Sequence, residues 1–197
     1  MAARKWPLAL GLALGLAAVA AGFMAGTDQV EQWRLAARWT ARVGFPLLIA
    51  TYLASSLATL FPGEASRALL RDRRWWGLGF AASHTVHLAA LVTFLRFSGE
   101  VRPLPVLLGG GGAYVLLYLM ALTSSGAAQR ALGRNWQRLH TVGIHWLWFI
   151  FAFSYLGRAL KPGTMLEGTV GFTIAMGALA LRVLAVRKRR ARRMGFA

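Results

Sequence analysis

The sequence of 197 residues contains no cysteine. This absence excludes disulfide bonds, thiolate zinc sites, cysteine-ligated iron–sulfur clusters and a cysteine nucleophile. It also excludes covalent attachment of a c-type heme, because the C-x-x-C-H motif needs two cysteines.

Acidic residues are scarce as well. The chain has 6 Asp and Glu against 23 Lys and Arg, which gives a net charge of +17. None of the acidic side chains lies in a long apolar run, so the sequence offers no carboxylate pair for acid–base catalysis inside a membrane and no acidic proton relay. It also has no G-x-G-x-x-G or Walker loop, so it lacks a standard nucleotide-binding motif. The acidic residues are Asp28, Glu31, Glu64, Asp72, Glu100 and Glu167.

Long apolar runs dominate what remains. Hydrophobic residues make up 57% of the chain, and the mean hydropathy is +0.50. Five uncharged runs are long enough to cross a hydrocarbon core of about 30 Å as helices. A sixth includes Arg182, whose long side chain we expect to reach the membrane interface. We predict an all-α integral membrane protein, a six-transmembrane-helix bundle forming a single domain over residues 1–197, with spans at about 7–26, 43–62, 75–96, 104–124, 137–157 and 165–186.

The first run resembles a secretory signal peptide. It is longer than the usual apolar core of about 7–15 residues, so we expect a helix that is retained.

Basic residues are distributed unevenly between the two sides of such a bundle. Sixteen lie on the side of both termini, and the other seven are Arg34, Arg38, Arg42, Arg96, Arg102, Arg158 and Lys161. The positive-inside rule then predicts that both termini are cytoplasmic and that the protein lies in a bacterial inner membrane. The basic run at 187–193 directly follows a span, so we expect it to contact anionic lipid and not nucleic acid.

All four histidines fall inside predicted spans, His84 and His87 in 75–96, and His140 and His145 in 137–157. Ionisable groups within a membrane are costly and usually mark a function, although neutral imidazoles can also bridge helices by hydrogen bonds. With no carboxylate or thiolate nearby, imidazoles in an apolar bundle suit heme iron better than a hard cation. We therefore predict one heme b, or two, between these two segments.

Helical geometry gives each histidine an expected depth. At 1.5 Å per residue from the cytoplasmic start of each segment, His84 and His145 lie roughly 15 Å deep, His87 roughly 20 Å and His140 roughly 8 Å. His84 and His87 are three residues apart and share a face, whereas His140 and His145 point roughly 140° apart. Depth therefore favours His84 and His145 as opposite ligands of one heme.

Two stretches resemble a known family. One is RRWWGLGFAASHTVHL (Arg73–Leu88), which is similar to a segment that ends in a heme-ligand histidine; the other is TSSGAAQRALGRNWQRLH (Thr123–His140), which matches a signature ending in LH. A weaker match covers RWTARVGFPLLIATYLASSL (Arg38–Leu57). The family is the ferric reductase-like transmembrane domain, and within it the heme-binding membrane subunits of bacterial periplasmic methionine-sulfoxide reductase systems. The resemblance implies that His87 and His140 ligate heme.

One position departs from that pattern. The family has a further ligand histidine thirteen residues beyond the LH position, and this chain has Phe153 there. Resemblance thus favours His87 and His140, while depth favours His84 and His145. We expect axial ligation by His87, which matches residue by residue, and by His145, because His140 lies close to the polar boundary. His84 and His140 are the alternatives.

These features predict a membrane cytochrome b subunit of an oxidoreductase. It would carry electrons from a cytoplasmic flavin or quinol donor to a periplasmic partner protein, which by resemblance is a methionine-sulfoxide reductase. One alternative is a stand-alone transmembrane reductase of ferric or other metal ions. Another is a heme-free membrane scaffold or transporter in which the histidines only bridge helices.

Overall fold

The computed structural model describes residues 4–195, and this part of the chain is helical without strands. Six of its helices are long and apolar enough to cross a membrane, which confirms the predicted all-α membrane architecture. The helices are α1 (Trp6–Ala25), α2 (Gln29–Leu60), α3 (Glu64–Ser98), α4 (Leu104–Leu122), α5 (Gly126–Leu132), α6 (Arg134–Ala159) and α7 (Met165–Arg193).

Two helices extend well beyond their predicted spans. α2 begins at Gln29, about four turns before the first residue of its predicted span, and α3 begins at Glu64, about three turns before that of its own. At the start of α2, the Asp28 side chain accepts a hydrogen bond from the Glu31 amide at 2.9 Å, which caps the helix. The charged residues therefore bound the apolar span but do not end the helix.

α5 was not predicted. The Ser125 hydroxyl accepts a hydrogen bond from the Ala128 amide at 3.1 Å and caps this short helix. The chain then turns into α6 at Gly133, whose φ of +49° favours glycine. A helix of two turns has too few apolar residues to give a clear periodic pattern, which is why the sequence does not predict it.

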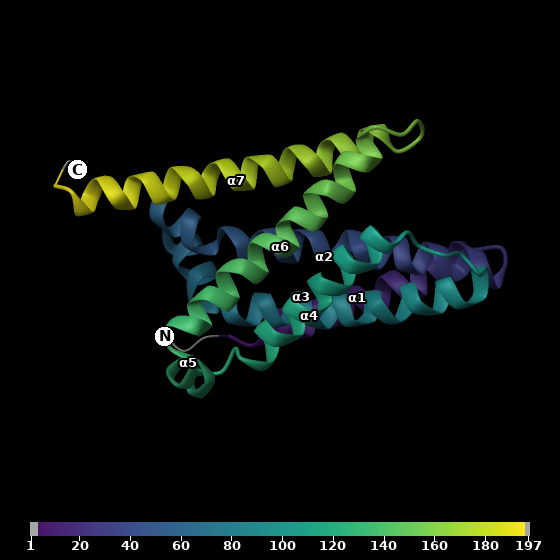
Figure 1. Ribbon diagram of the computed structural model, residues 1–197, viewed down its shortest axis with the longest axis horizontal. Helices are drawn as coiled ribbons and strands as arrows, with labels where there is room; N and C mark the ends of the chain where they lie inside the picture. The colour runs from purple at the N-terminus through teal and green to yellow at the C-terminus, as the bar shows by residue number, and fades with distance from the viewer. Residues whose placement is uncertain (1–3, 196–197) are drawn as a thin grey trace.

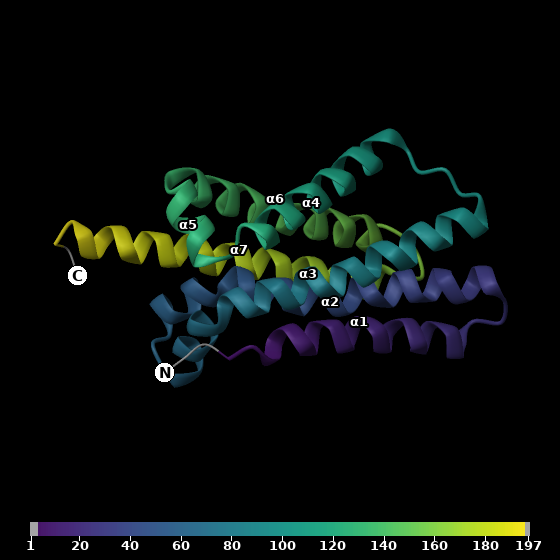
Figure 2. The ribbon, with the colours of Figure 1, turned by 90° about the horizontal axis from the view of Figure 1, so that it is seen from below.

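The helices form two groups. Figures 1 and 2 show α1, α2 and α3 running alongside one another, with α4, α6 and α7 on the other side, and α2 contacts α7 across the groups. α1 begins and α7 ends at the same end of the bundle, where α7 projects beyond the other helices (Figure 1). We call this end, which also carries α5, the arginine-rich end. Among the described residues, no Cα atom of α3 lies within 8 Å of a Cα atom of α6.

Small residues bring α1 and α3 into backbone contact. A Cβ atom added to Gly11 would lie 2.1 Å from the carbonyl oxygen of Gly79, and one added to Gly79 would lie 2.2 Å from that of Pro7. Such close approach is a common way for membrane helices to gain packing energy. α1 is thus an integral part of the bundle.

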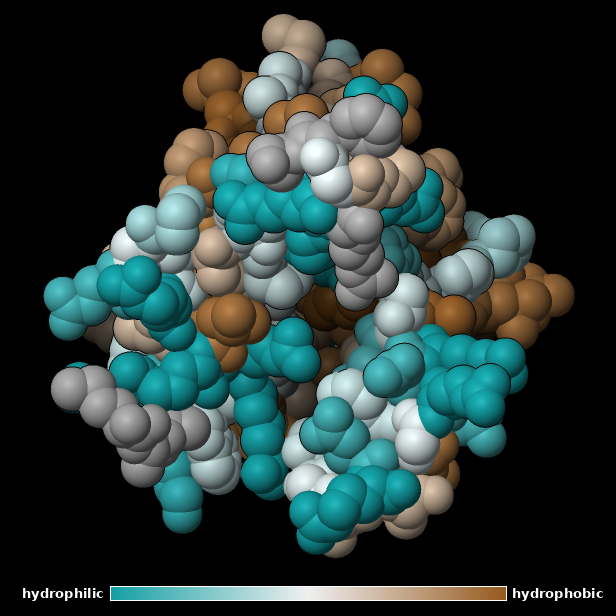
Figure 3. All heavy atoms as spheres, turned by 90° about the vertical axis from the view of Figure 1, so that its left-hand side faces the viewer, coloured by the Kyte–Doolittle hydropathy of each residue, from teal (hydrophilic) through white to brown (hydrophobic). Residues whose placement is uncertain are grey.

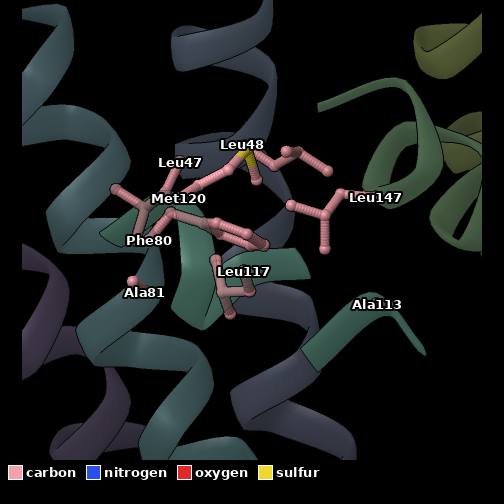
Figure 4. Close-up of a cluster of buried hydrophobic side chains, with 8 residues drawn as sticks. All are labelled: Leu47, Leu48, Phe80, Ala81, Ala113, Leu117, Met120 and Leu147. Carbon is pink, nitrogen blue, oxygen red and sulfur yellow. The ribbon is translucent and has the colours of Figure 1, made fainter. Parts of the chain in front are cut away.

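A buried apolar cluster joins the two groups (Figure 4). α2 and α3 contribute to it from one group, and α4 and α6 from the other. Its members are Leu47, Leu48, Phe80, Ala81, Ala113, Leu117, Met120 and Leu147.

Candidate functional site

Two cavities lie between the helix groups. The larger has a volume of ≈ 420 Å³ and reaches the arginine-rich end, and we call it the arginine cavity. The smaller has a volume of ≈ 160 Å³, and we call it the histidine cavity because His84 and His87 line it. Leu117 and Leu147 line both cavities, so the two spaces adjoin within the gap between α3 and α6.

His84 is the most deeply buried of the four histidines, with 7% of its surface exposed. Its ring packs directly on Gly44 of α2, where an added Cβ would lie 2.5 Å from the imidazole Nδ1. The ring centroids of Phe80 and Phe151 are 4.4 and 5.3 Å away. Its Nδ1 atom has no hydrogen-bond partner in the protein, which is unusual for a buried polar atom.

The hydrogen bonds around His87 set its tautomer. Thr40 Oγ1 lies 3.0 Å from His87 Nδ1 and 2.7 Å from the Ala36 carbonyl oxygen. A hydroxyl has one hydrogen, and the carbonyl can only accept, so the hydroxyl donates to Ala36 and accepts from the imidazole. His87 Nδ1 therefore carries the proton, and its Nε2 keeps a free lone pair for a metal.

His145 has the same tautomer for a different reason. Its Nδ1 donates to the Thr141 carbonyl oxygen at 2.7 Å, which leaves Nε2 free. Its ring meets the Tyr52 ring of α2 edge to face, with centroids 5.6 Å apart. His145 lines neither cavity.

His140 lines the arginine cavity and has the opposite tautomer. Its Nε2 lies 3.3 Å from Thr123 Oγ1, and that hydroxyl donates to the Leu119 carbonyl oxygen at 2.6 Å. By the same reasoning Nε2 carries the proton. The ring also stacks on Trp136, with centroids 4.1 Å apart. His140 and His145 face different neighbours, as their spacing of five residues implies.

The structure does not place His84 and His145 at one height. The α6 residue beside His84 is Phe151, six residues beyond His145, which corresponds to roughly 9 Å along the helix. His87 lies about one turn further toward the opposite end. The depth estimate from sequence differs because α3 and α6 cross at an angle, so equal counts from their starts do not give equal heights.

Phe153, at the family's third ligand position, points away from the cavities. Its side chain is 64% exposed and stacks on Phe149, with centroids 6.0 Å apart. The α6 wall of the histidine cavity is instead formed by Leu147, Ile150, Phe151 and Ser154. His84 and His87 therefore have no histidine facing them across this cavity.

The arginine cavity combines cations with an apolar lining. Arg71, Arg73, Arg74 and Arg182 line it, together with Trp136, Phe80 and other residues of α2, α3, α4 and α6. Viewed from the arginine-rich end, hydrophilic side chains surround a central hollow with apolar groups at its floor (Figure 3). Arg182 turns toward α2, where its Nη1 donates to the Tyr52 carbonyl oxygen at 2.8 Å and its guanidinium lies over the Tyr52 ring at 4.5 Å.

A separate ionic cluster links α2, α6 and α7 near the opposite end. Glu167 accepts hydrogen bonds from Arg42 Nε at 2.8 Å and from Arg158 Nη1 at 3.1 Å. Sharing one carboxylate between two guanidiniums ties three helices together. We assign this cluster to the packing of the bundle.

Sequence reasoning identified the histidines but missed the residues that orient them. Thr40, Thr123 and Gly44 lie on other helices, and nothing in their spacing along the chain indicates an imidazole beside them. Arg182 carried a visible signal, a charge within an apolar run. The direction of the Arg182 side chain, however, depends on how α7 packs against α2.

These features fit a heme better than a bare metal ion. Within residues 4–195, no group of three or more histidine and acidic side chains could hold a metal ion. A heme needs only one or two axial imidazoles, an apolar slot for its ring and cations for its carboxylates. The gap between α3 and α6 offers imidazoles with free nitrogen atoms, apolar walls and arginines.

Comparisons with known proteins give relatives in bacteria. The chain is 34% identical over 131 residues to the protein-methionine-sulfoxide reductase heme-binding subunit MsrQ of Cronobacter sakazakii, covering 59% of this chain and 64% of the relative. It is 31% identical over 169 residues to MsrQ of Salmonella enteritidis, covering 78% of this chain and 75% of the relative. MsrQ of an Enterobacter species is 30% identical over 159 residues, or 73% of each chain.

No family model matches the chain, and no solved structure matches it. The curated relatives nevertheless cover most of the six-helix bundle at 30% identity or more. The chain therefore belongs to the family of MsrQ, whose members are named as heme-binding subunits of protein-methionine-sulfoxide reductase.

Proposed function

We propose that this chain is a cytochrome b subunit of the bacterial inner membrane that delivers electrons through heme to a methionine-sulfoxide reductase. The observation that carries the proposal is the gap between α3 and α6, which is lined by imidazoles with free ring nitrogens and by arginines. The names of the relatives support both the heme and the acceptor. When bound, heme supplies one-electron transfer through its iron.

We propose His87 and His145 as axial ligands, with His84 and His140 as alternatives. The reason is common to both residues: Nδ1 is held by a hydrogen bond, and Nε2 is free. The two residues lie at different heights, so this assignment requires two heme b groups and not one shared iron. His140 is the alternative at the second site because it lines the arginine cavity, which His145 does not.

The direction of electron flow follows from the proposed topology. If the arginine-rich end is cytoplasmic, a flavin or quinol donor reduces the heme near that end, and the periplasmic reductase accepts electrons at the other. The residues between the two cavities are apolar, with Leu117 and Leu147 shared by both linings. These side chains exclude water from the space between the proposed hemes.

A four-variant spectral series tests the ligand assignment. His87→Ala and His145→Ala should each lose one of the two hemes, because each heme is assigned a single axial imidazole. His84→Ala and His140→Ala should keep both hemes with shifted potentials. An unchanged heme content in both of the first two variants would refute the assignment.

A further inference from the structure

Arg182 lies in the apolar part of α7 without an acidic partner. None of the ion pairs among the side chains that the structure describes includes Arg182. One of its five N–H donors is used by the Tyr52 carbonyl oxygen at 2.8 Å. An arginine within a membrane protein usually faces a partner or a cavity, and Arg182 lines the arginine cavity.

The cavity around Arg182 has an excess of positive charge. Its lining includes Arg71, Arg73 and Arg74 but no carboxylate, although Asp72 pairs with Arg71 beside it. Arg73 and Arg74 are exposed at the mouth, whereas Arg182 is half-buried. In a region of low dielectric, uncompensated cations of this kind attract an anion strongly.

The other walls of the cavity fit a flat apolar body. Phe80 and Leu147 line it from α3 and α6, and both belong to the buried cluster of Figure 4. The stacked rings of Trp136 and His140 form part of the α6 wall. The ligand that suits this cavity is therefore a flat amphipathic molecule with an anionic edge.

We propose that Arg182 binds the propionate carboxylates of the heme nearer the arginine-rich end, with Arg73 and Arg74 completing the positive edge. This inference rests on the proposed heme function and adds the orientation of the heme, whose carboxylate edge faces the arginine-rich end. A carboxylate buried in a membrane protein needs a paired cation, and guanidinium can bind it through two parallel hydrogen bonds. Arg182 is thus a positioning residue for the heme.

The first test needs no mutation. The full chain is purified from cells that make no heme and is titrated with hemin and with hemin dimethyl ester, in which both carboxylates are uncharged. Hemin should bind about 10- to 100-fold more tightly, as expected for charge-assisted hydrogen bonds. Equal binding of the two compounds would contradict this inference alone, whereas binding of neither would contradict the proposed function and the inference with it.

The second test uses variants of α7. Arg182→Gln should bind hemin about 10- to 100-fold less tightly, should lose the preference over the dimethyl ester and should lower the heme's midpoint potential, because a nearby cation favours the reduced form. Arg182→Lys should keep part of the preference, because it keeps the charge but not the planar fork.

Arg189→Gln is the matched control. Arg189 is two turns further along the same helix, donates to Thr59 Oγ1 at 3.0 Å and lines neither cavity. This variant should bind hemin with wild-type affinity and potential. An equal loss in Arg182→Gln and Arg189→Gln would show a general effect of charge and would overturn the assignment.

Discussion

Replacing Thr40 with valine should weaken heme binding without disturbing the shape of the bundle. Thr40 is fully buried on α2, and valine has nearly the same volume. The substitution removes the oxygen that accepts a hydrogen bond from His87 Nδ1. The Ala36 carbonyl keeps its ordinary helical partner, so the imidazole N–H is the group that loses an acceptor.

The expected magnitude follows from that single lost bond. Loss of a partner that orients a metal-binding histidine lowers metal affinity about 10- to 100-fold, which corresponds to about 1.4–2.8 kcal/mol. The midpoint potential should also rise, because an imidazole without this acceptor donates less electron density to ferric iron.

Hemin titration of the heme-free chain, followed by redox titration of the loaded protein, measures both effects. Thr93→Val is the control, because Thr93 makes the same type of hydroxyl bond, to the Ala89 carbonyl at 2.8 Å, and lines neither cavity. The control should match the wild type. If Thr40→Val also binds heme with unchanged affinity and potential, the tautomer deduced for His87 and its role as a ligand are refuted.

Three further predictions follow from packing and topology. Gly44→Ala should force the His84 ring to move and destabilise the protein by about 1–3 kcal/mol, measured by thermal unfolding in detergent. Gly157→Ala, which has open space, should be neutral or stabilising by up to about 1 kcal/mol, and equal effects of the two would show that His84 does not pack on Gly44 as described. Gly11→Ala should separate α1 from α3 and lower the unfolding temperature, whereas Gly111→Ala should not; an undiminished unfolding temperature in Gly11→Ala would contradict the backbone contact. A cytoplasmic reporter fused after Arg193 should be active and a periplasmic reporter should be inactive. Activity of the periplasmic reporter would contradict the proposed topology.

The sequence was enough to predict the helices that cross the membrane, because apolar length is a strong signal when every backbone group must be satisfied within the helix. It did not predict where α2 and α3 begin, since Asp28 and Ser66 cap helices that continue through charged residues. Charge marks the edge of the apolar region, while caps mark the end of the helix.

For the histidines, too, the sequence predicted some properties and left others to the packing of the helices. Their chemistry and their location in two segments were evident from residue type alone, but their heights were not, because the crossing of α3 and α6 places Phe151 and not His145 beside His84. The hydroxyls of Thr40 and Thr123, which fix two tautomers, come from α2 and α4. Only the packed structure brings such distant residues together.

The most direct test of the account is an absorption spectrum of the detergent-purified full chain, oxidised and dithionite-reduced, with heme quantified against protein. We expect a b-type spectrum and two hemes per chain, since His87 and His145 lie at separate heights. A single heme per chain would contradict the assignment to two sites. A colourless protein from heme-replete cells, unchanged by added hemin, would contradict the central claim that the gap between α3 and α6 is a heme site.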